Sequence, residues 1–179
     1  MTTANVIKLI VFAVLSAGII AFSWPSLRRP RSHGFWRFFA FEAIVALFLL
    51  VVDGWFRSPL APHQIVSWVL LTVAGVLAVW GFYLLRAIGK PEGSFEDTTV
   101  LVKRGLYKVI RHPLYSSLLF LVWGIFFKAP SLVGGALALI VSAALFATAK
   151  ADEAECIEKF GSAYEDYIKE TRMFIPLLF

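Results

Sequence analysis

The chain has 179 residues, enough for one domain, and 59% of them are hydrophobic whereas only 16% are charged. This composition, with a mean hydropathy of +0.77, excludes an ordinary soluble protein and predicts an integral membrane protein. The net charge of +5 comes from basic clusters beside apolar runs, and it indicates cytoplasmic loops rather than nucleic-acid binding. The single cysteine excludes a disulfide framework and a cysteine-rich metal site.

Three apolar runs in the first half of the chain each predict a membrane helix. The first, Asn5 to Phe22, is about as long as a hydrocarbon core of about 30 Å requires, and we expect it to end at Trp24-Pro25. Because it lacks a basic leader and a convincing cleavage site, we expect it to be retained rather than removed as a signal peptide. The second and third helices are predicted at Phe35 to Val52 and Ile65 to Ile88.

Charged residues around the second helix predict its orientation. Four arginines lie before it or in its first turn: Arg28, Arg29, Arg31 and Arg37. By the positive-inside rule this side is cytoplasmic and the N-terminus lies outside. Glu42 lies about a turn and a half inside the helix, so it is either functional or paired with Arg37 or Arg86.

The stretch Val100 to Tyr115 brings basic, aromatic and turn-forming residues to the mouth of the next helix. Pro113 suits the first turn of that helix, because proline has a fixed φ and no N–H. The free N–H groups and the positive end of the helix dipole then make a natural anion site beside Arg111 and His112.

The rest of the chain predicts a hairpin and an amphipathic tail. Leu114 to Phe127 would be only about 21 Å long as a helix, and Ser131 to Thr148 is rich in small residues that allow close packing. Lys128, in the turn between them, agrees with an outside position. Acids then alternate with apolar residues at near-helical spacing in Asp152 to Arg172, so we expect an amphipathic helix that continues beyond the bilayer and folds over the cytoplasmic face.

The predicted architecture is therefore an all-α integral membrane protein with about five transmembrane helices, the last two a hairpin, and a cytosolic amphipathic C-terminal helix. We expect one membrane domain, 1–179, made of an N-terminal three-helix part, 1–99, and a core, 100–179. This topology places the basic stretch and the acidic tail on the same cytoplasmic side. A ligand that suits both patches is a methionine-derived nucleoside, although the composition alone does not require it.

The second half of the chain also resembles a known family. The shared pattern is L-V-x-x-G-x-Y-x-x-x-R-H-P-x-Y, followed by an acidic pair seven to eight residues before F-G-x-x-Y-x-x-Y. Here it is met by Leu101, Val102, Gly105, Tyr107, Arg111, His112, Pro113, Tyr115, Asp152-Glu153, Phe160-Gly161, Tyr164 and Tyr167. The chain is thus similar, over Val100 to Pro176, to the isoprenylcysteine carboxyl methyltransferase family and its bacterial and phospholipid methyltransferase relatives.

The resemblance implies a methyltransferase that uses S-adenosyl-L-methionine, with S-adenosylhomocysteine as product and no metal. It implies cofactor contacts at Leu101, Val102, Gly105, Tyr107, His112, Pro113, Tyr115 and Glu153. We expect Arg111, Glu153 and Arg172 to be the catalytic residues. Arg172 stands one position before the place where many bacterial relatives have a basic residue, which Met173 occupies here. The acceptor is expected to be lipophilic and to enter sideways from the bilayer.

The nature of the acceptor depends on which groups steer it. A carboxylate, such as that of a prenylated cysteine, is the main expectation and needs a cation such as Arg111 or Arg172. An amine of a phospholipid or a small thiol needs a base, for which Glu153 and Glu42 are candidates. The other alternative is a non-catalytic protein of the same fold that binds a lipid or the cofactor.

Several conspicuous residues also have an ordinary interpretation. His112 with Arg111 could anchor the helix to phosphate headgroups. We interpret Cys156 as a small apolar side chain that packs in the protein interior, and Tyr164 and Tyr167 as packing residues. We interpret Glu155 as part of a solvated face, paired with Lys159 four residues later, so that its loss should have little effect.

Overall fold

The computed structural model describes residues 2–92 and 98–176, and every regular element in these ranges is a helix. The elements are α1 (Thr3–Leu27), α2 (His33–Val51), the 3₁₀ turn η1 (Val52–Gly54), α3 (Pro62–Gly89), the 3₁₀ turn η2 (Gly105–Lys108), α4 (Pro113–Phe126), α5 (Leu132–Phe160) and α6 (Ser162–Glu170). The predicted all-α class is confirmed.

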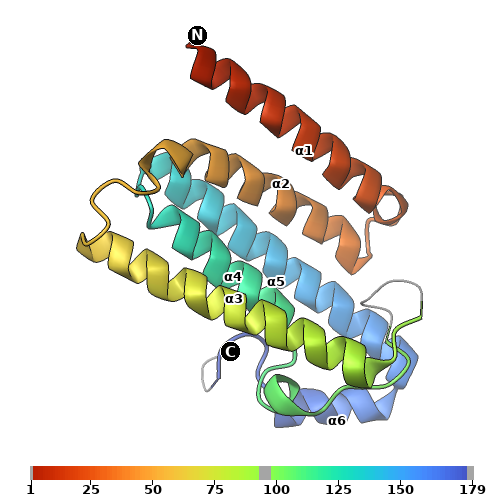
Figure 1. Cartoon of the computed structure of the whole chain (residues 1–179). Helices are drawn as coiled ribbons and strands as arrows, with labels where there is room; N and C mark the ends of the chain where they lie inside the picture. Colours follow the sequence, from red (N-terminus) through yellow and green to blue (C-terminus); the bar gives the residue numbers. More distant parts are fainter. Residues whose placement is uncertain (1, 93–97, 177–179) are drawn as a thin grey trace.

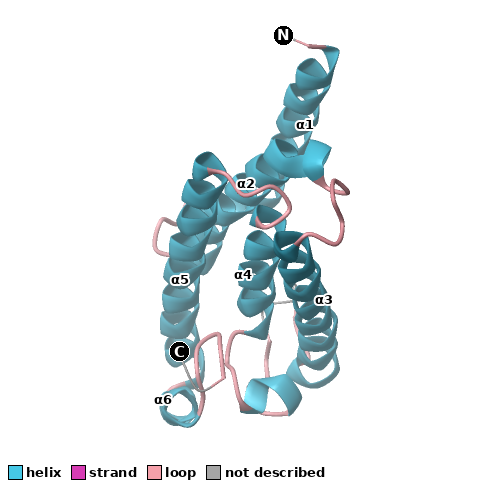
Figure 2. Cartoon of the chain, turned by 90° about the vertical axis from the view of Figure 1, so that its left-hand side faces the viewer, coloured by secondary structure: helices cyan, strands magenta, loops and turns pink. Residues whose placement is uncertain are grey.

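The helices form a bundle around the antiparallel pair α4 and α5 (Figure 1). Helix α2 packs along α5, α3 packs along α4, and α1 lies on the outer side of α2. The short helix α6 lies at the end of the bundle where α3 and α5 finish and α4 begins (Figure 2). The buried core lies between α2, α4 and α5 and includes Leu47, Val122, Val141 and Leu145.

Four helices are long and apolar enough to cross a membrane: α1, α2 together with η1, α3 and α5. Helix α4, with 14 residues, is apolar but shorter, as the sequence predicts. Large apolar side chains face outward, for example Leu132 and Val79, with 93% and 73% of their surface exposed. The chain is therefore a multi-pass integral membrane protein by the composition of its helices. Its orientation stays a prediction.

Two predicted helix boundaries are wrong. Helix α1 continues through Pro25 to Leu27, because a proline in the last turn removes only one intrahelical hydrogen bond. The tail is not one helix, because α5 runs from the membrane to Phe160 and stops at Gly161. Gly161 has a φ of +58°, which glycine adopts without strain. The chain changes direction there before α6.

Lys128, in the turn between α4 and α5, is buried with 1% of its surface exposed. Its Nζ donates a hydrogen bond to Gln64 Oε1 over 3.1 Å and lies 3.2 Å from the centroid of the Trp68 ring. Gln64 in turn donates from Nε2 to the carbonyl of Lys128 over 2.8 Å. These contacts fasten the hairpin turn to α3, at the end of the bundle opposite α6.

Glu155 keeps 43% of its side chain exposed, but its carboxylate contacts His33 of α2, so the interpretation as an ordinary pair with Lys159 is wrong. Its Oε1 accepts a hydrogen bond of 2.9 Å from the backbone N–H of His33, and its Oε2 lies 2.7 Å from Nδ1 of the same residue. The carboxylate therefore occupies the N-terminus of α2, where a negative charge is stabilised by the helix dipole and by free N–H groups. It ties α2 to α5.

Replacing Glu155 by alanine should therefore lower the free energy of unfolding by about 1 kcal/mol, as the loss of a helix cap does. The change should appear as a lower melting temperature of the purified protein in detergent. Glu158→Ala is the matched control, because Glu158 is exposed one turn further along α5. Equal melting temperatures for the two variants would contradict the assigned role of Glu155.

Candidate functional site

A cavity opens at the end of the bundle where α4 begins, and it encloses about 620 Å³ of empty space, its open mouth included. Its lining comes from α3, the stretch before α4, α4 itself, α5 and α6: Leu85, Thr98, Leu101, Val102, Tyr107, Arg111, His112, Pro113, Leu114, Tyr115, Asp152, Cys156, Phe160, Tyr164 and Tyr167. Six of the predicted cofactor-binding residues are in this set, and so is Arg111. The predicted stretch and the tail helix thus meet at one site.

The position of the chain before α4 is fixed by a glycine turn against α3 and by a hydrogen bond from α6. Gly105 has a φ of +59°, and a Cβ at this position would lie 2.7 Å from Leu84 Cδ1. Only glycine therefore allows η2 to turn against α3. Tyr167 of α6 donates its hydroxyl to the carbonyl of Tyr107 over 2.5 Å. Gly105 shapes the wall of the cavity but is not part of its lining.

The segment after α6 pairs with the residue before the helix mouth. The backbone N–H of Arg111 donates to the carbonyl of Arg172 over 2.8 Å, and the N–H of Arg172 donates to the carbonyl of Val109 over 3.0 Å. Arg172 therefore contributes its backbone, while its side chain is exposed and is not part of the cavity lining. The structure does not bring the Arg172 guanidinium into the site.

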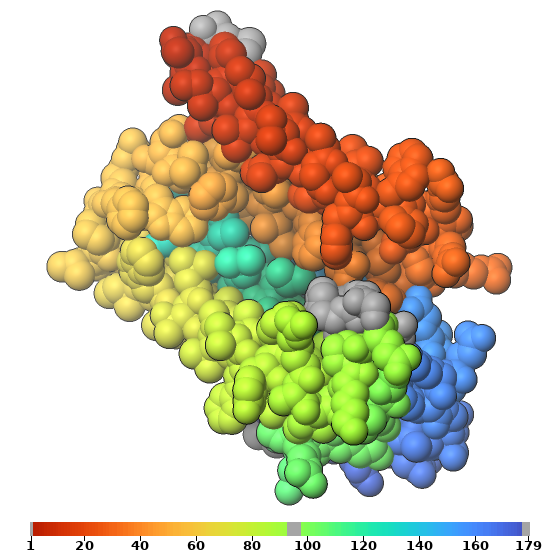
Figure 3. All heavy atoms as spheres, turned by 45° about the vertical axis from the view of Figure 1, so that its right-hand side comes forward, coloured from red at the N-terminus to blue at the C-terminus, as the bar shows by residue number. Residues whose placement is uncertain are grey.

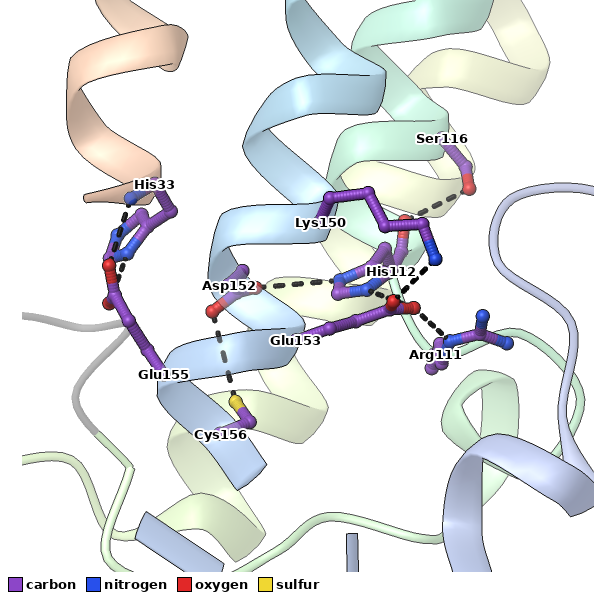
Figure 4. A network of polar contacts seen from close by, with 9 residues as sticks. All are labelled: His33, Arg111, His112, Ser116, Lys150, Asp152, Glu153, Glu155 and Cys156. Carbon is purple, nitrogen blue, oxygen red and sulfur yellow. Dashed lines mark hydrogen bonds and ion pairs between the residues drawn. The ribbon is translucent and has the colours of Figure 1, made fainter. Parts of the chain in front are cut away.

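His112 and Asp152 form the polar centre of the cavity (Figure 4). The distance from His112 Nδ1 to Asp152 Oδ2 is 3.4 Å, and the imidazole stacks on the ring of Tyr115 with the centroids 5.4 Å apart. His112 Nε2 is buried and lies 3.5 Å from Glu153 Oε1, with no hydrogen bond to any of the described residues. Each imidazole nitrogen thus lies near one carboxylate of the acidic pair.

Glu153, the predicted acid of the site, is not part of the cavity lining, although it contacts two lining residues, Arg111 and His112. Its Oε1 accepts a hydrogen bond of 2.5 Å from Arg111 Nε, and its Oε2 accepts one of 3.0 Å from Lys150 Nζ (Figure 4). Arg111 also donates from Nη1 to the carbonyl of Thr171 over 2.9 Å. The Glu153 side chain is 7% exposed, whereas that of Asp152 is 26% exposed. Glu153 therefore braces Arg111, and Asp152 is the acid that reaches the cavity.

The charge state of His112 follows from these neighbours. Burial by itself lowers the pKa of His112, but the polar contacts and negative charges of the neighbouring Asp152 and Glu153 outweigh it, so the pKa is raised above 6.5. A group with a raised folded-state pKa stabilises the fold fully below its unfolded value of about 6.5. That stability is lost as the pH rises through the folded-state pKa.

The melting temperature of the wild-type protein should therefore be higher than that of a His112→Gln variant, and the difference should be largest below about pH 6. The difference should shrink as the pH rises past the folded-state pKa of His112, because the imidazole is then neutral in both states. Thermal unfolding of both proteins across pH 5 to 9 measures it. A difference that grows with pH would show that His112 is buried in its neutral form.

Several residues that line the cavity were not predicted as site residues. The helical spacing of three of them in the sequence could have identified those three. Asp152, Cys156 and Phe160 are spaced four residues apart, so they share one face of α5. Tyr164 and Tyr167, predicted as packing residues, are buried and line the cavity from α6. Glu42 is remote: its Oε2 accepts a hydrogen bond of 2.6 Å from Ser16, not from an arginine, and it does not line the cavity.

Among the described residues, the cavity lining combines five aromatic residues with one carboxylate, one guanidinium and one imidazole: Tyr107, Tyr115, Phe160, Tyr164, Tyr167, Asp152, Arg111 and His112. Aromatic rings accept a flat base or a cation over their faces. The carboxylate accepts hydrogen bonds from hydroxyl or ammonium groups, and the guanidinium binds carboxylates. The lining thus suits a ligand that carries a flat ring system and groups of both charges.

Comparison with known proteins identifies the relatives of this region. The phospholipid methyltransferase family matches residues 62–169. Methanethiol S-methyltransferase 2 of Bradyrhizobium diazoefficiens is 34% identical over 76 residues, which cover 41% of this chain and 28% of that protein. Methanethiol S-methyltransferase of Pseudomonas deceptionensis is 29% identical over 96 residues, which cover 52% of this chain and 33% of that protein. The chain thus spans a third or less of the length of these relatives, and no solved structure matches it significantly.

Proposed function

The chain belongs to the phospholipid methyltransferase family, and from this premise we propose that it is an integral membrane methyltransferase that transfers a methyl group from S-adenosyl-L-methionine to a small thiol. The observation that carries the proposal is the cavity at the mouth of α4. It lies almost wholly within the family match, and it brings His112 and Tyr115 together with Asp152. Both relatives are named for methylation of methanethiol.

The lining residues fit the proposed cofactor. Asp152 would hold its ammonium or ribose hydroxyl groups, and His112 Nε2, which has no hydrogen bond among the described residues, offers a further polar contact. Arg111 supports binding of its carboxylate, and Tyr107 and Tyr115 offer ring faces to its purine or sulfonium. When bound, the cofactor supplies a methyl group already activated by the positive sulfur. The protein contributes binding, orientation and exclusion of water.

A small thiol accounts for the comparisons better than the lipophilic carboxylate that was the main expectation. The residues that would steer a carboxylate are Arg111 and Arg172. Arg111 is engaged by Glu153 and by the carbonyl of Thr171, and the side chain of Arg172 is exposed away from the cavity. A small apolar thiol dissolves in the bilayer, and we propose that it enters sideways between the helices.

An assay with three candidate acceptors tests the proposal. The purified protein is incubated with methyl-labelled cofactor and with methanethiol, a prenylated cysteine analogue or phosphatidylethanolamine. We expect labelled dimethyl sulfide from methanethiol, measured by gas chromatography of the headspace. A base-labile product from the cysteine analogue would instead identify a carboxyl methyltransferase, and a labelled phospholipid an amine methyltransferase. Titration with S-adenosylhomocysteine by calorimetry tests cofactor binding separately, and its absence would refute a methyltransferase.

A further inference from the structure

A second hollow lies between the turn that joins α1 to α2 and the C-terminal part of α5. It encloses about 1210 Å³ of empty space, its open mouth included. Among the described residues, its lining is Pro25, Ser26, Arg29, Arg31, Ser32, His33, Ala151, Ala154, Glu155 and Glu158. In Figure 3, the orange atoms of the α1–α2 turn lie above the blue end of α5, on the right-hand side of the molecule. We call this hollow the turn pocket.

The turn pocket and the cavity at the mouth of α4 lie on different faces of α5. Asp152 and Cys156 line the cavity, whereas Ala154 and Glu158 line the turn pocket. Figure 4 shows the contact of Glu155 with α2 on one side of α5 and the contact of Asp152 with the start of α4 on the other. The two linings share no described residue. A ligand in the turn pocket therefore does not occupy the proposed cofactor site.

The turn pocket lies where α1 and α5 both pass from apolar to polar sequence. Trp24, directly before the lining residue Pro25, is 53% exposed, and the guanidinium carbon of Arg28 lies 5.1 Å from the centroid of its ring. In α5, the first charged residue is Lys150, directly before the lining residue Ala151. An exposed tryptophan and basic residues at the end of an apolar helix are typical of the headgroup level. We therefore expect the mouth of the pocket to face lipid headgroups.

The charged groups of the turn pocket favour an anion. Arg29 and Arg31 are exposed, and their guanidinium groups have no hydrogen bond or ion pair with any described residue. Of the two carboxylates, that of Glu155 is engaged by His33, whereas that of Glu158 has no such partner among the described residues. Unpaired guanidinium groups thus outnumber unpaired carboxylates two to one. Guanidinium groups bind phosphate with two parallel hydrogen bonds.

The backbone of the α1–α2 turn is fixed without a ligand. The N–H of Arg29 donates to the carbonyl of Ser26 over 2.9 Å, and the N–H of Ser32 donates to the carbonyl of Arg29 over 2.9 Å. Ser32 Oγ donates to the carbonyl of Ser26 and accepts from the N–H of Phe35, both over 3.3 Å. A side chain at Gly34 would collide with Ser26. Binding therefore has to order the two arginine side chains but not the turn itself.

We propose that the turn pocket binds the phosphodiester headgroup of an anionic phospholipid, with Arg29 and Arg31 on the phosphate. The excess of unpaired guanidinium groups favours a headgroup without a compensating ammonium, such as phosphatidylglycerol. Phe22, one turn before Ser26, is 57% exposed and offers an apolar surface to an acyl chain. Since α1 packs mainly on α2, the bound lipid joins the α1–α2 turn to α5. This site is independent of the proposed methyl transfer, and so is its test.

Thermal unfolding of the delipidated protein in detergent tests the proposal. Three ligands are titrated separately: dioctanoyl phosphatidylglycerol, dioctanoyl phosphatidylcholine and inorganic phosphate. A ligand that binds only the folded protein raises the melting temperature as its concentration rises. We expect phosphatidylglycerol to raise it by about 3 °C or more. Phosphatidylcholine, which carries a compensating cation, and free phosphate, which has no acyl chain, should leave it unchanged at the same concentrations.

Three variants show whether the turn pocket is the site of this effect. Arg29→Gln combined with Arg31→Gln should weaken the apparent affinity for phosphatidylglycerol about tenfold or more. Glu158→Gln should tighten it about twofold to fivefold, because an unpaired negative charge is removed from the lining. Arg104→Gln combined with Lys108→Gln is the matched control, because it removes two exposed positive charges at η2, at the same end of the bundle. Its affinity should equal that of the wild type.

Wild-type affinity in the variant that lacks Arg29 and Arg31 would overturn the proposal. An equal loss in the control variant would also overturn it, because the attraction would then arise from the overall charge of this end of the protein. Equal stabilisation by phosphatidylcholine or by inorganic phosphate would overturn the assignment to an anionic lipid. Should the arginine variant not fold, Glu158→Gln decides alone, and an affinity no higher than that of the wild type would overturn the proposal.

Discussion

Replacing Glu153 by alanine should lower the free energy of unfolding by about 3–5 kcal/mol, because it removes one partner of a buried ion pair. The Arg111 and Glu153 side chains are only 9% and 7% exposed. Without the carboxylate, the guanidinium of Arg111 stays buried with its charge uncompensated, and Lys150 loses its contact as well. Thermal unfolding in detergent should show a large drop in melting temperature.

Glu158→Ala is the matched control for this variant, since it removes the same charge from the exposed side of α5. We expect its melting temperature to stay close to that of the wild type. If Glu153→Ala keeps a wild-type melting temperature and loses only its affinity for S-adenosylhomocysteine, then Glu153 is the acid that binds the cofactor, as the family resemblance implies, and our assignment of Asp152 is wrong.

Replacing Asp152 by asparagine should reduce the affinity for S-adenosylhomocysteine about a hundredfold. The change preserves the shape of the side chain and leaves an oxygen to face His112, so the melting temperature should change little. It removes the one carboxylate that the described residues contribute to the cavity lining, on which the proposed contacts to ammonium or hydroxyl groups depend. Calorimetric titration of S-adenosylhomocysteine measures the effect.

Cys156→Ala is the control for the neighbouring lining position, because Cys156 contributes no charge to the cavity. We expect its affinity for S-adenosylhomocysteine to stay within about twofold of the wild type, since only a small side chain and its weak thiol contact of 3.8 Å with Asp152 are lost. Wild-type affinity in Asp152→Asn would contradict the role of Asp152. Taken with the Glu153 variant, the two measurements identify which neighbouring acid faces the ligand.

The helices and the existence of the site could be predicted, because long apolar runs and the spacing of the two motif segments are local properties of the sequence. The rotation of α5 could not. Asp152 and Glu153 are adjacent, so they point about 100° apart around the helix. Which of them faces the cavity is set by the packing of Ala138, Val141 and Leu145 against the neighbouring helices. The sequence therefore predicts an acidic pair but not which of the two acids lines the cavity.

The boundary between the predicted parts, 1–99 and 100–179, also stays a prediction. Leu85 of α3 lines the cavity, and the family match begins at residue 62, so we propose that α3 belongs to the cofactor-binding core. The burial of Arg37 could not be predicted, because a basic residue near the end of a membrane helix ordinarily marks topology. Its burial depends on tertiary packing around α2, which the sequence alone does not reveal.

The shortness of α4 determines how deep in the bilayer the chemistry takes place. Fourteen residues span about 21 Å, whereas a hydrocarbon core is about 30 Å thick. Lys128 and Gln64 fasten the far end of the hairpin to α3, so we expect the shortfall of about 9 Å at the end where α4 begins. Under the proposed function, we expect the water-soluble cofactor to descend below the headgroups, whereas a membrane-dissolved acceptor needs only to diffuse sideways to meet it. The thickness of the surrounding bilayer thus becomes a determinant of how the two substrates reach each other.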